Sequence, residues 1–109
     1  MEIIRYMKED GSVPLSDWLS TLRDMQAKTA IRRRIDRFGA GNPGNTRYLR
    51  NGVSELKIDM GPGYRVYYAL NGQTIVLLLC GGDKGTQVAD IAKAVGFWEN
   101  WKNLNRSGT

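Results

Sequence analysis

The sequence predicts a small α+β domain, and three observations lead to this prediction. Two stretches with helical spacing precede a series of alternating, strand-like segments, and a third helical stretch follows them. The chain has 109 residues, enough for one hydrophobic core but not for two. Its composition, 41% hydrophobic and 25% charged, is that of a globular protein. We therefore predict a single domain over residues 1–109 with the order β-α-α-β-β-β-α, in which two helices pack on a small, mostly antiparallel sheet and a C-terminal helix follows.

The first half of the chain is predicted to supply one strand and both packing helices. Residues 2–7 are β-prone. Ser16 follows a proline by two positions and is expected to cap a short helix. A second helix is predicted over residues 26–38, where apolar residues recur with a 3.6-residue period. Its opposite face is basic and carries Lys28, Arg32, Arg33, Arg34 and Arg37.

The second half is predicted to supply the strands and the last helix. Strands are expected over residues 53–60, 64–70 and 74–80, and residues 46–49 could begin another. Alternation places Glu55 and Lys57 on one face of the first of these strands, and Arg65 and Tyr67 on one face of the next. Thr86 is expected to cap a helix that ends near residue 102, and residues 105–109 are expected to form a loose tail.

Charge and residue usage restrict the function. The formal net charge is +5 and the pI is near 9.6, which favours an anionic partner, nucleic acid first and an acidic protein second. Cys80 is the single cysteine and the chain has no histidine, so neither a disulfide nor a Cys–His pair can form. We expect Cys80 to be a buried structural thiol, and we expect no metal and no cofactor.

The longest apolar run is too short to cross a membrane, and the N-terminus lacks the features of a signal peptide. We therefore expect a cytoplasmic protein without a membrane partner.

The segments GPGYRVYY and LLLCGGDKGTQ, with the Asn71-Gly72 hairpin between them, carry a resemblance to a known family. The chain resembles the RelE/ParE superfamily of toxins from type II toxin–antitoxin systems, and more narrowly its HigB-like branch of addiction-module killer proteins. The resemblance extends from the first strand through ADIAKA in the last helix. It implies a RelE-like fold and a cognate antitoxin, commonly a helix-turn-helix DNA-binding protein.

For the RelE and HigB branches, the resemblance implies a metal-independent endoribonuclease that cuts mRNA, usually on the ribosome. In that reaction the ribose 2′-OH attacks the adjacent phosphorus, so the protein must move protons and stabilise the charged phosphorane. Arg65 matches the arginine of the family's YR pair, and Lys84 lies where RelE-type enzymes carry a cation. Both would stabilise the phosphorane. Lys57 or Glu55 would accept the 2′ proton, Lys57 only where neighbouring cations favour its neutral form.

Further residues are candidates for contact with RNA. Tyr67 could stack on a base. Cations that could bind phosphate are Arg33, Arg37, Arg47 and Arg50. The chain also departs from its relatives. RelE has two lysines in the strand where this chain has only Lys57. RelE also has a tyrosine beyond its last cation, whereas this chain has no tyrosine after Tyr68. Lys84 or water would then serve as the general acid.

Each site residue also has a purely structural interpretation. Arg65 could form a salt bridge with Asp59 or Glu55, Lys84 could be an ordinary turn lysine, and the arginines of the helix could form a solvated face. Two alternative functions follow. The chain could be a ParE-like toxin that inhibits DNA gyrase by protein–protein contact, or a decayed toxin that only binds its antitoxin.

Overall fold

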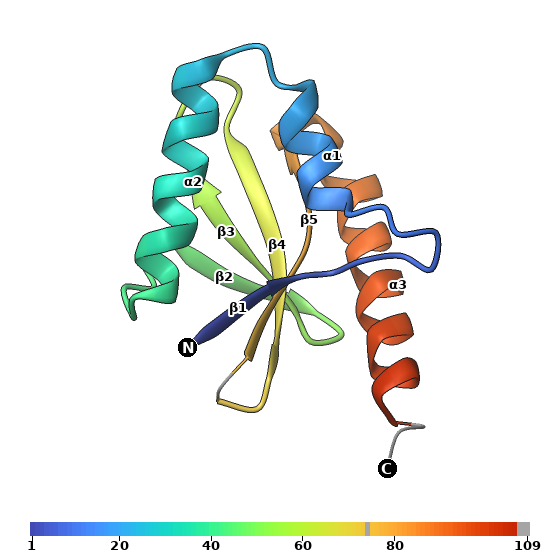
Figure 1. Ribbon diagram of the computed structural model, residues 1–109. Coiled ribbons are helices and arrows are strands. Elements are labelled where there is room, and N and C mark those ends of the chain that lie inside the picture. Colours follow the sequence, from blue (N-terminus) through green and yellow to red (C-terminus); the bar gives the residue numbers. More distant parts are fainter. Residues whose placement is uncertain (74, 107–109) are drawn as a thin grey trace.

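The computed structural model describes residues 1–73 and 75–106, and it shows a five-stranded sheet with helices on both faces (Figure 1). In chain order the elements are β1 (Glu2–Arg5), α1 (Pro14–Thr21), α2 (Met25–Gly39), β2 (Thr46–Arg50), β3 (Val53–Ile58), β4 (Tyr64–Asn71), β5 (Ile75–Asp83), the single 3₁₀ turn η1 (Lys84–Thr86) and α3 (Gln87–Arg106). The predicted α+β class is confirmed, and residues 46–50 form a strand of their own.

The strands lie in the order β1-β5-β4-β3-β2. Only β1 pairs in parallel, with β5, and the three other pairings are antiparallel. A local irregularity between β4 and β5 leaves Leu79 without a direct partner, because Tyr67 pairs with Cys80 and Tyr68 with Leu78. As a result Leu79 and Cys80 both pack on the same face of the sheet.

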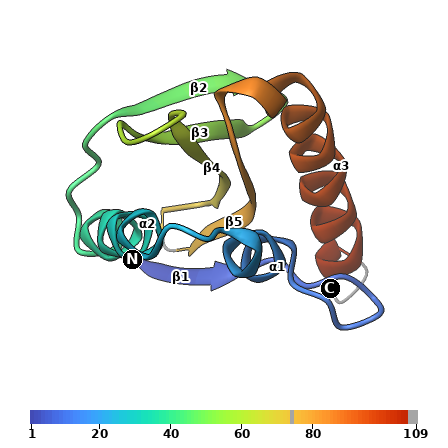
Figure 2. The same cartoon turned by 90° about the horizontal axis from the view of Figure 1, so that it is seen from above.

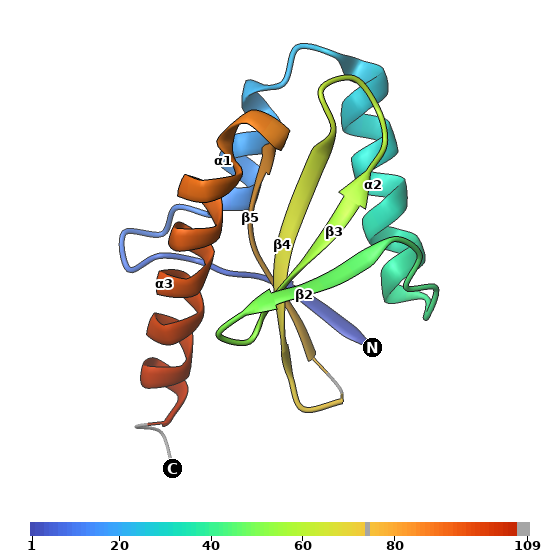
Figure 3. The same cartoon turned by 180° about the vertical axis from the view of Figure 1, so that it is seen from behind.

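Two hydrophobic clusters cover the two faces of the sheet. Helices α1 and α2 pack on one face, over residues that include Leu56, Val66 and Leu78. Helix α3 packs on the other, over Val53 and Leu77 among others. Figure 2 shows α2 and α3 on opposite sides of the strands, and Figure 3 shows α3 and β2 from behind. The central strands β4 and β5 are therefore buried on both faces, which explains their nearly continuous apolar sequence.

Three helix ends differ from the prediction. Helix α1 begins at Pro14, because proline fits the first helical position, and Ser16 instead accepts a hydrogen bond from Arg5 (2.8 Å). Before α3, Asp83 rather than Thr86 is the capping residue, since its carboxylate accepts a bond from the backbone of Gly85 (2.8 Å). Helix α3 also extends through Arg106.

Two of the predicted segments reach beyond the described residues. Thr74, the predicted start of a strand, and residues 107–109 of the predicted tail lie outside the described residues. Asn105, which was also expected in that tail, is helical and its side-chain amide donates to the carbonyl of Trp101 (2.8 Å). Within residues 1–73 and 75–106, no helix has the length and apolar character that crossing a membrane requires.

Candidate functional site

The face of the sheet toward α3 brings four predicted site residues together. Strands β3 and β4 pair so that Glu55 lies opposite Tyr67 and Lys57 lies opposite Arg65. Because residues directly opposite each other in a sheet project to the same face, all four side chains start from one surface. The alternation in the sequence had predicted one such pair along each strand, and the register joins the two pairs across the strands.

Arg65 is the centre of this group, and two parts of its guanidinium have partners. Only 9% of the residue is exposed. Its Nε lies 3.3 Å from Oε2 of Glu55, and its Nη1 donates to the carbonyl of Gly63 at 2.8 Å. Among the residues that the structure describes, Nη2 has no hydrogen bond or ion pair. The guanidinium is thus held in place while one donor group is left for a ligand.

Glu55 is a fully buried carboxylate between two arginines. Its Oε1 lies 3.0 Å from Nη2 of Arg47, whose side chain is 60% exposed, and its Oε2 faces Arg65. Both contacts are at ion-pair distance, yet neither carboxylate oxygen has a partner with hydrogen-bond geometry. The attraction is therefore mainly Coulombic, and it compensates the cost of burying Glu55 and Arg65. The structural interpretation of Arg65 as a partner of Glu55 is correct in this conformation.

Lys84 approaches Arg65 at Gly63, in the turn between β3 and β4. A Cβ built on Gly63 would lie 3.2 Å from Nη1 of Arg65 and 3.8 Å from Cβ of Lys84. Gly63 has φ +80°, which a residue with a side chain rarely adopts. Lys84 is exposed, at the first position of η1 directly after β5. Glycine at this position thus leaves room for the guanidinium of Arg65 and for the start of the Lys84 side chain.

Tyr67 and Cys80 lie beneath α3 beside this group. Tyr67 is fully buried, and its hydroxyl has no hydrogen-bond partner among the described residues. Burial, with a further contribution from the charge of Glu55, raises the pKa of Tyr67. Burial likewise raises the pKa of Cys80 to about 12, and its thiol donates to the backbone carbonyl of Asp90 (3.6 Å). Cys80 is therefore the buried, unreactive thiol that was expected. The ring of Tyr67 presents no free face for a base in this conformation.

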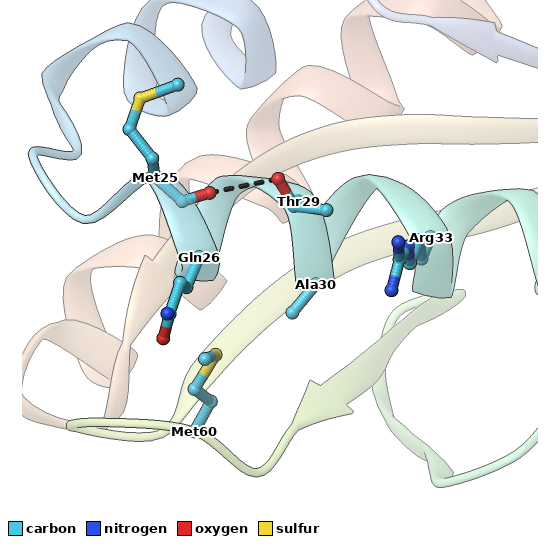
Figure 4. A pocket seen from close by; sticks show the side chains of 6 residues that line it. All are labelled: Met25, Gln26, Thr29, Ala30, Arg33 and Met60. Atoms are coloured by element: carbon cyan, nitrogen blue, oxygen red, sulfur yellow. Dashed lines mark hydrogen bonds between the residues drawn. The ribbon is translucent and has the colours of Figure 1, made fainter.

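The arginines of α2 form a separate group on the opposite side of the sheet. Arg33, Arg37 and Lys57 line a hollow of about 300 Å³ together with Arg34. Arg33 also borders an adjoining groove of about 430 Å³, which is lined further by Met25, Gln26, Thr29, Ala30 and Met60 (Figure 4). Lys57 is thus the one predicted residue that borders both groups within the described part of the chain.

Arg50 lies apart from both groups. It ends β2 at the position that pairs with Val53, and Val53 in turn lies opposite Ala69, four positions along β4 from Arg65. Its guanidinium donates to the side chain of Asn51 (3.4 Å).

Asp90 is a site residue that the sequence did not reveal. Only 8% of it is exposed, and its carboxylate accepts a hydrogen bond from the hydroxyl of Thr86. A Cβ on Gly82 would collide with this carboxylate, and Gly82 lies opposite Arg65. The only signal in the sequence was a threonine four residues before an aspartate in the first turn of a helix, a spacing that puts both on one face.

The described residues contain no group of three or more metal-binding side chains from His, Cys, Asp and Glu. What the site offers is positive charge around a buried carboxylate. Arg47 comes from β2, Lys57 from β3 and Arg65 from β4, and Lys84 follows the end of β5. Such an arrangement can bind and stabilise a phosphate group without needing a metal ligand set.

The fold and this cluster define a class of protein, a small α+β domain with an arginine-centred cationic site on its sheet. A family model described as phage derived protein Gp49-like (DUF891) matches residues 17–95, from α1 to the middle of α3, and the chain belongs to this family. It is a RelE/HigB-like family that is associated with the toxins of toxin–antitoxin systems, and such a toxin has a cognate antitoxin as partner.

The chain is also similar to a protein of Haemophilus influenzae. It is 45% identical over 83 residues, which are 76% of this chain and 84% of the relative, and it carries the name "Uncharacterized protein". The relative therefore shows that the domain occurs nearly in full length elsewhere, and adds nothing on activity.

Proposed function

We propose that this protein is the toxin of a type II toxin–antitoxin system and acts as a metal-independent endoribonuclease on mRNA, in the cytoplasm and in association with the ribosome. Cleavage of mRNA would inhibit translation, and a cognate antitoxin, of the helix-turn-helix DNA-binding kind, would neutralise the toxin. The observation that carries this proposal is the position of Arg65, whose Nη1 is held at Gly63 while Nη2 is left for a ligand, with the Cβ of Lys84 close to the same glycine.

The two cations would act on the phosphate. The guanidinium of Arg65 is held by Glu55 and by the carbonyl of Gly63, so its remaining donor has a fixed direction. Fixed donors that point at developing charge lower the barrier because they need no reorganisation during the reaction. Lys84, exposed and flexible, would neutralise a second phosphate oxygen or protonate the leaving 5′ oxygen.

Lys57 is better placed than Glu55 to accept the 2′ proton. It lies directly opposite Arg65 in the register and is partly exposed, whereas Glu55 is fully buried and faces two arginines. In this assignment Glu55 positions Arg65, and Arg47 would contact RNA phosphate from the exposed edge of the sheet.

The experiment is brief induction of the protein in growing cells, followed by mapping of new RNA 5′-OH ends. We expect such ends inside coding regions with the natural chain, and a loss of about 100-fold with Arg65→Ala, the usual effect of removing one fixed donor to the transition state. Arg65→Lys keeps a cation beside Glu55 and separates lost chemistry from lost folding. The control is Lys102→Ala, which also removes one positive charge but at the surface, beside Glu99. Growth arrest without such ends would refute the nuclease proposal.

One observation favours the second candidate, a toxin that acts by protein–protein contact. Glu55 is fully buried and faces both Arg47 and Arg65, and Tyr67 is covered, so part of the expected catalytic set is engaged within the fold. A ParE-like toxin would lower the supercoiling activity of purified DNA gyrase, and Arg65→Lys would not change that effect. A decayed toxin would bind the antitoxin and cause no arrest.

A further inference from the structure

A pocket separate from the cationic site lies between α1 and α3, over the C-terminal part of β5. Its volume is about 450 Å³, within the range of sites for small ligands. Trp18 of α1 and Phe97 of α3 line it from two sides, and Gly81 of β5 lies between them. Figure 1 shows the two helices beside β5. Glycine is required at this position, because a Cβ there would collide with the ring of Trp18.

The polar groups of the pocket carry both signs of charge. Lys8 and Lys93 are exposed at its border, and Nζ of Lys8 lies 5.8 Å from the centre of the Phe97 ring. Asp90 contributes a buried carboxylate, in which one oxygen accepts a bond from Thr86. The pocket therefore combines aromatic surface, two ammonium groups and one enclosed acceptor.

This combination matches the parts of a nucleotide. A planar base packs well against aromatic side chains, a phosphate pairs with ammonium groups, and a carboxylate accepts hydrogen bonds from an exocyclic amino group. A purely apolar ligand would leave three charged groups unused, and a simple anion would leave the aromatic walls unused. We propose that this pocket binds one nucleotide, with its base at Trp18 and Phe97, its phosphate at Lys8 and Lys93, and its amino group at Asp90.

The position of Asp90 links this pocket to the cationic site. Its carboxylate lies against Gly82, which is directly opposite Arg65 on the next strand. A nucleotide held here would be a neighbour of the phosphate at Arg65, so Asp90 would select its base. This last placement rests on the proposed ribonuclease function, whereas binding of a nucleotide to the pocket does not.

The test is a titration of the full-length chain, followed by NMR at the backbone of Gly81 and the indole of Trp18. The probes are cytidine and uridine monophosphate, and a short oligodeoxycytidylate that cannot be cleaved because it lacks the 2′-OH. We expect cytidine monophosphate, which has an exocyclic amino group, to bind about 10-fold more tightly than uridine monophosphate, the effect of one well-placed hydrogen bond. Asp90→Asn, which keeps an acceptor for Thr86, should remove this difference.

Charge variants provide the matched control. Changing both Lys8 and Lys93 to Gln should weaken the binding of cytidine monophosphate about 10-fold and make its affinity less dependent on salt. Changing Lys28 and Lys102 to Gln removes the same amount of charge at positions outside the pocket, and it should leave the affinity unchanged. Equal loss with both double variants would contradict the proposal.

The remaining outcomes separate the source of the nucleotide. Displacement of the mononucleotide by the oligonucleotide would support a nucleic-acid chain as the source, and binding of the mononucleotide alone would support a free nucleotide. Absence of any shift at Gly81 and Trp18 with either probe at millimolar concentration would overturn the proposal. Binding without RNA cleavage in cells would uphold the pocket and refute the ribonuclease, so the two failures are distinguishable.

Discussion

At the scale of single residues, Glu55 determines how Arg65 is presented. A carboxylate with no exposed surface is costly to bury, and the two arginines beside it compensate that cost from opposite sides. Their exposures differ, since Arg65 is buried and Arg47 is not. The buried pair should therefore matter for stability, while the exposed pair should matter little.

This difference leads to a prediction on stability. Glu55→Gln leaves Arg65 buried beside a neutral amide, and we expect the free energy of unfolding to fall by about 3 kcal/mol. Arg47→Gln, at a side chain that is 60% exposed, should lower it by less than about 1 kcal/mol. Urea unfolding followed by circular dichroism measures both. Equal losses for the two variants would show that the buried ion pair is not the stronger one.

At the scale of elements, β5 pairs with β1 and β4 and is approached by α1 and α3 from its two faces. Its two glycines, Gly81 and Gly82, let Trp18 of α1 approach one face and Asp90 of α3 approach the other. The close approach of two helices to one strand end is what forms the nucleotide pocket and places α3 beside Arg65. Side chains at these positions would push the helices away.

Substitution of these glycines tests the arrangement. Gly81→Ala should destabilise the fold by about 2 kcal/mol, because Trp18 has to leave its position and the packing around it is tight. Gly96→Ala in α3 is the matched control, since nothing lies within 4 Å of a Cβ there. In a helix interior that change should stabilise by about 0.5–1 kcal/mol. Thermal unfolding of both variants measures these changes in stability. A stabilising effect of Gly81→Ala would contradict the close approach of Trp18 to Gly81.

The elements show how much of the fold could be predicted. Local patterns sufficed for the class, for every helix and for the strands, because periodicity and turn residues are local signals. The predicted start of α1 was wrong, because Pro14 occupies the first helical position and Ser16 is not the cap. The cap before α3 was wrong for a similar reason, because Asp83 and the turn η1 precede Thr86.

The site was less predictable, because it depends on contacts between distant segments. Alternation placed Glu55 and Arg65 on strand faces correctly, and the turn with Lys84 was expected next to them. Alternation did not show that Glu55 and Tyr67 are fully buried, nor that Asp90 lies at Gly82. Those facts depend on contacts between segments that are distant in the chain, and no short segment of sequence encodes such contacts.

At the scale of the whole molecule, cations occur on both sides of the sheet. One group surrounds Arg65 on the face toward α3, and the other follows α2, with Lys57 at the edge between them. With a net charge of +5, the protein would attract a polyanion from any direction, and the group at Arg65 sets a buried guanidinium beside a buried carboxylate. We therefore place the proposed reaction at that face, and the proposed general affinity for RNA at both.

We propose that the group at Arg65 cleaves RNA through the ribose 2′-OH. The decisive experiment incubates purified protein with programmed ribosomes and analyses the chemistry of the new RNA ends. We predict 2′,3′-cyclic or 3′-phosphate ends together with 5′-OH ends, and their loss with Arg65→Lys. Ends carrying a 5′-phosphate, or equal cleavage by Arg65→Lys, would each contradict this assignment.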